Sequence, residues 1–495
     1  MKALIMGGGM SGLATAVNLL EQGIEVEIIE ADEIFGGRAN SWLDEDGDMI
    51  DNALHVFLPY YVNLVAFFRK MGIEGNLLWR KPEYHYPQDN GEDCVMRFPN
   101  LPTPLHSASA FLGMIKNYKA VSRMKMILSS LAMAGLMGIS KDGLDKMDEV
   151  SWAEWTGKRG PKGAFKHFDP AVHGLTFTEP HSMSAKVMAS WINKLMAGPE
   201  YSFLAFANGG LGEIWVESCL NYIKSKGGTF ETKKAVTAIN IANGKISDVV
   251  VNGKEKRTAD LYISAMSPYA LRKLIPKECF KYSYFQDICY FENAPSLSIQ
   301  VWLDKSITDC DVLMMHNDCI FSCTADLANI LPHIFKGGSM MEMVLTPADH
   351  LVHMPDETIF ERTMEDLKRL FPEARTAKVK KYKVVRERQG VYRAYPGMEK
   401  HRPYQRSPFD NFYLTGDWTS TPVSSGGMEA AIWTANHCAE VIMQDKFKKS
   451  ISLNIDFNPP KGLLPLVKPS MYAGGAAIVW VFLRLVAALA TKLVR

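Results

Sequence analysis

The feature that most constrains this chain is a glycine-rich turn close to its N-terminus. Gly7, Gly9 and Gly12 follow a short apolar run at 2–6 and open a segment, 11–22, with the apolar spacing of a helix. The first glycine permits a tight turn, the second lets the backbone approach a pyrophosphate, and the third lets the helix pack closely on the strand. Because the start of a helix offers free N–H groups to an anion, the pattern predicts a dinucleotide-binding β-α-β unit.

An acidic residue and a second pair of glycines strengthen this prediction. Glu30 follows the next apolar run, at 26–29, where a carboxylate accepts hydrogen bonds from ribose hydroxyls and disfavours a 2′-phosphate. The stretch Gly36-Gly37-Arg38 comes next, and Arg38 is suited to bind phosphate or to neutralise charge beside a cofactor. The glycine turn alone does not separate one dinucleotide from another.

Together, the glycine turn, Glu30 and Gly37-Arg38 resemble the FAD-dependent amine oxidase and carotenoid desaturase superfamily. The resemblance favours FAD over NAD. It implies an α/β fold in which a Rossmann-like FAD-binding domain of the GR2 type is combined with an interleaved substrate domain and a helical membrane-associated region.

Four further stretches narrow the resemblance. Residues 42–48, 54–57, 60–64 and 151–155 are similar to plant- and cyanobacterial-type phytoene and zeta-carotene desaturases. In that family the segment that holds His55 lies close to the flavin ring, so the resemblance implies that His55 contacts flavin or substrate and makes it the candidate catalytic residue. A purely structural histidine is the alternative. Val236 lies on a strand-like run that packs by the adenine in this family.

A second motif stands near the C-terminus. Residues 411–419 predict a strand that ends in Gly416-Asp417, and Gly427-Met428 opens a helix. Free N–H groups beside a strand-end carboxylate suit the ribityl chain and the flavin edge where reduction builds negative charge. The pattern matches the second FAD motif of the family, in which Asp417 would contact the cofactor and the backbone of Met428 would face the ring. The residues that we expect to contact the cofactor are Gly7, Gly9, Met10, Ser11, Gly12, Glu30, Gly37, Arg38, His55, Val236, Gly416, Asp417, Trp418, Gly427 and Met428.

The length of 495 residues predicts several domains, and the motifs indicate that they are interleaved along the chain. Strand-like runs between 229 and 264 indicate a small antiparallel meander. The apolar stretch 101–139 has a helical pattern and is suited to form core, to wall a lipid-sized cavity or to face a membrane. The expected division is a discontinuous FAD-binding domain at 1–100, 205–290 and 385–445, a helical cavity or membrane-facing region at 101–204, a substrate-binding domain at 291–384 and a C-terminal tail at 446–495.

An apolar stretch at 471–494 predicts membrane association. At about 1.5 Å per residue it is long enough to cross a bilayer. Arg484 weakens a spanning helix, so a helix lying in the interface is an equal alternative, and a core or dimer helix is a third. The chain begins without a signal-peptide pattern. We therefore expect it at the cytoplasmic side of a membrane, held by this apolar helix, and leave a homo-oligomer open.

Composition and motif searches exclude other classes of function. The net charge is +1 and no basic tract is interleaved with aromatics, so nucleic acid is not an expected partner. The eight cysteines are scattered, and the close pair Cys319 and Cys323 has no second pair at zinc spacing, which predicts reduced thiols and no metal site. The sequence has no Ser-His-Asp order, zinc-protease motif or Walker-type loop that would indicate a chemistry other than that of a flavin.

The predicted function is an FAD-dependent desaturase or dehydrogenase of a lipophilic polyprenoid such as phytoene or zeta-carotene. Hydride would pass to the flavin and then to a quinone, which is implied by resemblance only. The segment 420–425 is small and polar, unlike that of carotene desaturases, and is closer to hydroxysqualene dehydroxylases. Such a dehydroxylase and an oxygen-using amine oxidase are the enzymatic alternatives. A flavin-free lipid-binding protein is disfavoured because Glu30, Arg38 and Asp417 are all present.

Overall fold

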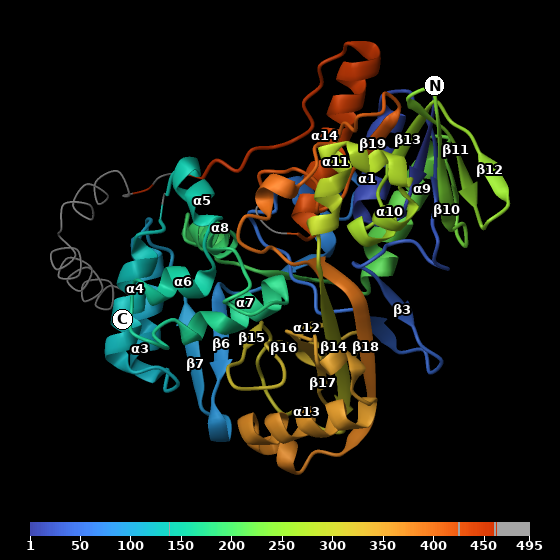
Figure 1. Ribbon diagram of the computed structural model, residues 1–495. Helices are drawn as coiled ribbons and strands as arrows, with labels where there is room; N and C mark the ends of the chain where they lie inside the picture. The colour runs from blue at the N-terminus through green and yellow to red at the C-terminus, as the bar shows by residue number, and fades with distance from the viewer. Residues whose placement is uncertain (138, 424–425, 460–461, 463–495) are drawn as a thin grey trace.

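The computed structural model describes residues 1–137, 139–423, 426–459 and 462. Two main sheets, each with its own helices, lie one above the other in Figure 1, and a lobe of helices lies at their side. Segments far apart in the sequence contribute to both sheets, as the mixture of colours within each sheet shows. The mixed α/β architecture agrees with the fold class that the sequence predicts.

The first sheet is five-stranded and entirely parallel. Its strands, in spatial order, are β19 (Phe412–Leu414), β13 (Leu261–Ser264), β1 (Lys2–Met6), β2 (Glu25–Ile29) and β9 (Thr229–Glu231). Residues 3–6 of β1 are fully buried, as expected for a central strand covered on both faces. Helix α1 (Met10–Glu21) packs beside α14 (Met428–Phe447), and the side chains of Asn18 and Asn436 join the two helices through a buried hydrogen bond of 2.8 Å.

The expected meander between 229 and 264 divides between two sheets. Its first and last strands, β9 and β13, join the parallel sheet, and the middle of it forms a separate antiparallel sheet of β10 (Val236–Ala242), β11 (Lys245–Val251) and β12 (Glu255–Arg257). The turns Asn243-Gly244 and Asn252-Gly253 have positive φ at all four residues, as their composition predicts. Short helices flank this part of the fold, namely α9 (Glu217–Ser225), α10 (Pro268–Leu274) and α11 (Ser283–Gln286).

The second sheet is mixed. Its strands, in spatial order, are β18 (Val379–Tyr392), β14 (Asn293–Leu303), β17 (Met340–Leu345), β16 (Cys323–Asp326), β15 (Met314–Met315), β6 (Glu83–Pro87) and β7 (Asp93–Arg97). Helix α13 (Asp356–Leu370) covers one face, where Ile299 and Val301 of β14 pack against Leu367. Two further helices near the two sheets are α2 (Val62–Lys70) and α12 (Leu327–Ile330). Four short strands form the hairpin β3 (Ser41–Leu43) with β4 (Met49–Asp51) and the pair β5 (Leu77–Trp79) with β8 (Ala205–Ala207).

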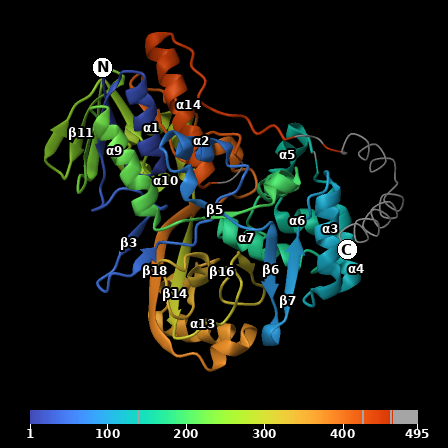
Figure 2. The same cartoon turned by 180° about the vertical axis from the view of Figure 1, so that it is seen from behind.

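The helices between residues 105 and 195 form one lobe, which lies beside β6 and β7 in both views (Figures 1 and 2). They are α3 (Leu105–Asn117), α4 (Arg123–Ala134), α5 (Lys141–Met147), α6 (Trp152–Gly157), α7 (Asp169–Thr176) and α8 (Ala185–Leu195). Ser151 and Glu154 form a capping box at the start of α6, and the rings of Trp152 and Trp155 stack with centroids 5.1 Å apart. The lobe is therefore helical, as predicted, and membrane association of it is not shown.

The predicted localisation at a membrane through an apolar helix is wrong on the evidence of the described residues. No helix among them is both long and apolar enough to cross a bilayer. Helix α14 has 20 residues but is interrupted by charges that include Glu429, Glu440 and Asp445. The apolar stretch 471–494 itself lies outside the described residues.

Candidate active site

The glycine turn after β1 leaves no room for a side chain at Gly8 or Gly12. A Cβ at Gly12 would lie 2.0 Å from the carbonyl oxygen of Gly7, and a Cβ at Gly8 would lie 2.1 Å from the ring of Phe35. Gly7 has a φ of +112°, in the region that favours glycine. Gly9 is the N-cap of α1, and no side chain caps the helix there. Backbone N–H groups at this helix start therefore remain available to an anion.

Glu30 lies at this turn, where its spacing predicts it. Its carboxylate accepts hydrogen bonds from the backbone N–H of Gly8 at 2.6 Å and of Asp32 at 3.0 Å. These bonds fix an acceptor beside the helix start, which is the position that a ribose diol requires. Met10 and Ser11 are the first residues of α1 and are buried against the same turn.

An ion pair joins the two predicted motifs across the chain. The Nη2 atom of Arg38 lies 2.7 Å from Oδ1 of Asp417, and Nη1 of Arg38 donates to the carbonyl oxygen of Gly390. Burial alone would lower the pKa of Arg38, but the carboxylate of Asp417 raises it. Gly37, with φ +59°, brings this segment close to the first turn, since a Cβ there would lie 3.2 Å from Cα of Gly9.

The start of α14 is a second uncapped helix terminus. Gly427 is its N-cap, with φ +125° and no side-chain cap, and the N–H of Gly427 donates to Oδ2 of Asp417 at 3.0 Å. A Cβ at Gly426 would lie 2.9 Å from the same carboxylate oxygen. Gly416 donates its N–H to Oγ1 of Thr434 at 3.2 Å, which ties the strand-end turn to α14. The carboxylate of Asp417 thus lies between Arg38 and the helix start.

Glu429 in the first turn of α14 holds the start of α2. Its carboxylate accepts hydrogen bonds from the N–H of Asn63 at 3.1 Å, from Nδ2 of Asn63 at 2.8 Å and from the N–H of Leu64 at 2.9 Å. Burial raises the pKa of Glu429, and the hydrogen bonds from Asn63 and Leu64 oppose this effect. Glu429 of α14 therefore orients the start of α2.

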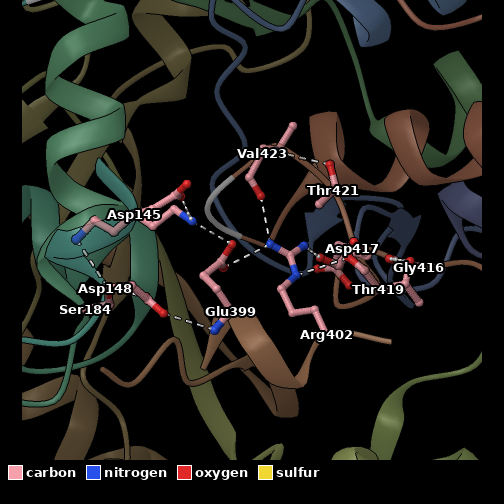
Figure 3. A network of polar contacts seen from close by, with 12 residues as sticks. Asp145, Asp148, Ser184, Glu399, Arg402, Gly416, Asp417, Thr419, Thr421 and Val423 are labelled. Atoms are coloured by element: carbon pink, nitrogen blue, oxygen red, sulfur yellow. Dashed lines mark hydrogen bonds and ion pairs between the residues drawn. The ribbon is translucent and has the colours of Figure 1, made fainter. Parts of the chain in front are cut away.

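Arg402 supports the loop that follows Asp417 (Figure 3). Its guanidinium donates to the carbonyl oxygens of Asp417 at 2.8 Å, Thr419 at 3.1 Å and Val423 at 2.9 Å. It also pairs with Glu399, which is in turn reached by Lys186 of α8. Burial would lower the pKa of Arg402, but Tyr392, Glu399 and Asp417 raise it. No sequence motif identifies Arg402 as a site residue, because its spacing in the sequence from the carbonyl groups that it binds is not fixed.

Two predicted cofactor residues have packing roles in the structure. Trp418 is 1% exposed, donates from Nε1 to the carbonyl oxygen of Met266 at 3.0 Å and packs edge-on against Phe291. Val236 begins β10 opposite Val251 and is only partly buried. Contact of either residue with a cofactor stays a prediction.

A cavity with an apolar lining lies where the helical lobe, the second sheet and the segment 53–56 meet. Its wall includes Tyr84, Phe111, Phe168 and Trp191. Among the described residues, none that lines it is Asp, Glu, Lys or Arg. Such a wall is suited to a hydrocarbon and unfavourable to a charged ligand.

His55 lies on the wall of this cavity. Its Nδ1 atom is 2.6 Å from the carbonyl oxygen of Ala53, to which a protonated Nδ1 donates. Desolvation lowers the pKa of His55 to about 4, although the backbone carbonyl groups of Ala53 and Arg38 oppose this. The imidazole is therefore neutral near pH 7 and is a weak base there. The structure places His55 on the cavity wall, and its contact with flavin or substrate stays a prediction.

A second and more polar cleft lies on the other side of α8. It is lined by Lys194 of α8, Trp433 of α14 and the segment 420–422, and Met196 lines both this cleft and the apolar cavity. Burial lowers the pKa of Lys194, and the nearby Glu429 opposes this effect. The cleft therefore reaches the loop that follows Asp417.

The residues of the site fit a bound FAD. The crowded glycine turn would exclude any side chain from the approach to a pyrophosphate, and the carboxylate of Glu30 faces the same turn. The second helix start, beside Asp417, offers N–H groups to the flavin end, and the neighbouring Arg38 keeps about two fifths of its side-chain surface exposed. Among the described residues, Asp44, Asp46 and Asp48 form a cluster of carboxylates. Lys381 pairs with all three of them, so this cluster already has a counter-charge.

Comparisons with known proteins agree with this geometry. A sequence model described as "Flavin containing amine oxidoreductase" matches residues 10–443. The chain is 29% identical over 476 residues to 15-cis-phytoene desaturase of Synechococcus elongatus, covering 91% of this chain and 98% of the relative. It is 29% identical over 483 residues to zeta-carotene desaturase of Synechocystis sp., covering 90% and 98%. A solved Methanosarcina mazei structure described as an oxidoreductase has a TM-score of 0.67 at 18% identity over 88% of this chain and 99% of that one, which shows the fold alone.

Proposed function

The chain belongs to the flavin-containing amine oxidoreductase family and is an FAD-dependent oxidoreductase, and on this premise we propose that it desaturates a carotenoid such as phytoene or zeta-carotene. The observation that carries the substrate class is the apolar lining of the cavity beside His55. A polyprenoid hydrocarbon loses its unfavourable contact with water there and requires no polar partner.

Desaturation removes a hydride and a proton from neighbouring carbons, and bound flavin supplies the hydride acceptor that side chains lack. The role of this chain is to bind and to orient. Asp417 and Arg38 hold the two motifs together, and the aromatic wall excludes water from the reacting carbons. The neutral His55 borders the cavity without adding charge to it.

A quinone is the proposed electron acceptor. The polar cleft beside 420–422 supports this proposal, because it offers an approach to the flavin loop that is separate from the apolar cavity. Trp433 in its lining provides a flat apolar surface for a ring, and Lys194 provides a hydrogen-bond donor for a quinone oxygen.

The cofactor contacts and the domain division are part of the proposal. The residues around the glycine turn, Glu30, Arg38, Asp417 and the start of α14 would hold FAD. We assign the cofactor residues to 1–100, 205–290 and 385–445, and the substrate wall to 101–204 and 291–384 together with the segment 53–56 and the cavity-lining residues of β6 and β7. Amine oxidation is disfavoured because the described cavity wall has no acidic side chain to receive an alkylammonium ion.

The test uses the FAD-loaded full chain under anaerobic conditions. Phytoene or zeta-carotene in detergent is expected to bleach the oxidised-flavin absorbance and to yield a product with a longer polyene, and added quinone is expected to restore the flavin colour. A primary amine serves as the control substrate. Bleaching by the amine but by neither carotene would overturn the proposal. Conversion of hydroxysqualene with a reductant, without any carotene turnover, would favour the dehydroxylase instead.

A further inference from the structure

The loop at the tip of the β3–β4 hairpin carries three aspartates in alternate positions. The carboxylate oxygens of Asp44, Asp46 and Asp48 lie within 4.8 Å of one another. Oδ1 of Asp44 also accepts the backbone N–H groups of Asp46 and Asp48, each at 3.0 Å. Three carboxylates at such distances repel one another. The shape of this loop therefore requires a positive charge to offset the repulsion.

Lys381 of β18 supplies that charge. Its Nζ atom pairs with Asp44 and lies 2.6 Å from Oδ2 of Asp46 and 2.8 Å from Oδ2 of Asp48. Burial would lower the pKa of Lys381, but hydrogen bonds to the three carboxylates raise it above its usual value. The hydrogen bond from Lys381 in turn lowers the pKa of Asp44. An ammonium group has three N–H donors, so Lys381 can bind all three carboxylates at once.

The tip of the hairpin has little else to hold it. Trp42 is 36% exposed and Leu43 is 69% exposed, so burial of apolar surface stabilises the tip only weakly. In the part of the chain that the structure describes, the hydrogen bonds and ion pairs that reach 44–48 from outside the hairpin all come from Lys381. Because a hairpin of two three-residue strands is marginally stable by itself, the place of its tip depends on this ammonium group.

A row of side chains on one face of β14 supports the hairpin from its base to its tip. Ser298, Gln300 and Trp302 occupy alternate positions on the strand, so they point to the same face. Oγ of Ser298 donates to the carbonyl oxygen of Asn52 at 3.3 Å, and Nε2 of Gln300 donates to that of the preceding residue at 3.4 Å. Trp302 pairs with Lys381 across the two strands, and Nζ of Lys381 is 5.4 Å from the centre of the indole ring.

The base of the hairpin leads in both directions to the proposed site. After β4, the segment 53–56 lines the apolar cavity and includes His55. Before β3, the carbonyl oxygen of Arg38 accepts a hydrogen bond from the side-chain amide of Asn52, and the guanidinium of Arg38 pairs with Asp417. Displacement of the hairpin would therefore move the cavity wall and the Arg38 segment together.

Strand β18 holds this unit at two points. Lys381 binds the tip, and the carbonyl oxygen of Gly390, further along the strand, accepts a hydrogen bond from Nη1 of Arg38. Both views show the hairpin beside β18 (Figures 1 and 2). We propose that Lys381 is a positioning residue whose ammonium group fixes the hairpin on the second sheet and thereby sets the place of the cavity wall at 53–56 and of the Arg38 segment. Its effect on substrate rests on the proposed function.

Hydrogen exchange of the FAD-loaded full chain, followed by mass spectrometry, tests the fixed hairpin without any substrate. Lys381→Met keeps a long side chain and removes the charge. The three carboxylates would then repel one another, and the backbone amides at 44–48 should exchange about tenfold faster than in wild type. Lys383→Met is the matched control, because Lys383 is exposed on the same strand, and it should keep the wild-type rate. Equal exchange in Lys381→Met and wild type would overturn the proposal.

A double-mutant cycle decides whether Lys381 acts through the aspartates. The background is Asp46→Asn with Asp48→Asn, a pair of changes at side chains that are 70% and 38% exposed and so leave the fold intact. In this background Lys381→Met should accelerate exchange by about threefold or less, well below its effect in the wild-type chain. An undiminished tenfold effect would mean that Lys381 acts by another route, and the proposal would fail.

The positioning role is measured at the flavin and at the cavity. Visible circular dichroism of bound FAD reports on the surroundings of the flavin, and it should change in Lys381→Met but not in Lys383→Met. If the proposed substrate is correct, the KM for the carotene should rise about fivefold in Lys381→Met, with kcat changing by less than about twofold.

Two outcomes separate the parts of this proposal. Faster exchange at 44–48 in Lys381→Met, together with wild-type dichroism and wild-type KM, would show that the ammonium group holds the tip alone, and the positioning role would be rejected. If wild type converts no carotene, the proposed substrate fails, whereas hydrogen exchange and flavin dichroism still decide the role of Lys381.

Discussion

At the scale of single residues, the cofactor loop depends on a buried arginine that the sequence does not mark. The Arg402 guanidinium is 1% exposed and binds the backbone carbonyl groups of Asp417, Thr419 and Val423. A lysine has a single ammonium group and cannot reach three diverging carbonyl groups at once. At least one buried carbonyl group would lose its partner, at a cost of about 1–3 kcal/mol.

Arg402→Lys is therefore expected to release FAD. We predict a fall in the free energy of unfolding of about 2 kcal/mol and a rise in the FAD Kd of about tenfold, since the loop carries Asp417. Flavin fluorescence during titration and thermal unfolding measure the two effects. Arg406→Lys is the control, because Arg406 pairs with Asp445 at the surface and its loss should change stability by about 0.5 kcal/mol or less. Equal FAD affinity in Arg402→Lys and wild type would contradict the assigned role.

The residues that could be predicted are those whose chemistry fixes their spacing. Gly7, Gly12 and Glu30 serve one β-α-β unit, so a short stretch of sequence contains the whole requirement. Arg402 and Glu429 act on groups that reach them only through the tertiary fold, and nothing in their neighbouring residues indicates it. The motif that contains Trp418 gave no indication that its side chain packs in the core, and its contact with the cofactor stays a prediction.

At the scale of elements, an extended segment after α14 ties that helix to α2. The carboxylate of Glu440 accepts the N–H groups of Leu453 at 2.7 Å and Asn454 at 3.1 Å. The N–H of Ile455 donates to Oδ1 of Asn63 at 2.8 Å. Asn63 and Leu64 are also the residues that Glu429 binds. The segment thus braces the start of α2 against α14.

Two truncations isolate this brace. A chain that ends at Ser450 loses the bonds to Glu440 and Asn63, whereas a chain that ends at Pro459 keeps them. We predict that the shorter chain has a Tm lower by about 3 °C than the longer one, for about 3 kcal/mol of lost hydrogen bonds and ring packing by Phe457. Flavin-loaded protein and a thermal ramp suffice for the comparison. Identical Tm values for the two truncations would show that the segment adds nothing to α14.

Elements were predictable where local chemistry decides them. The turns Asn243-Gly244 and Asn252-Gly253 form as their composition requires. The assignment of β9 and β13 to the parallel sheet was missed, because a short buried strand carries no mark of which neighbour it will pair with. The same limit applies to β6 and β7, which join a sheet whose other strands begin only at Asn293.

At the scale of the whole molecule, the cavity exists only because distant parts of the chain close around it. Its wall takes residues from the segment 53–56, from helices α7 and α8 and from strands β15 to β17. The sequence predicted an apolar region at 101–139, but it could not predict that Phe111 of this region would line the same cavity as His55 and Val344.

Filling the cavity tests the proposed substrate class at this scale. Ala171 of α7 lines the cavity and is 4% exposed, so a phenylalanine there would occupy space that the hydrocarbon requires, at an overpacking cost of about 1–3 kcal/mol. Ala171→Phe should raise the KM for the carotene about tenfold or more while flavin content stays at the wild-type level, because the cofactor residues lie elsewhere. Ala242→Phe adds the same ring at an exposed position on β10 and should leave KM unchanged. Steady-state turnover and the flavin-to-protein absorbance ratio separate the two effects. If Ala171→Phe lost flavin but kept its KM, the space beside α7 would belong to the cofactor and not to the substrate.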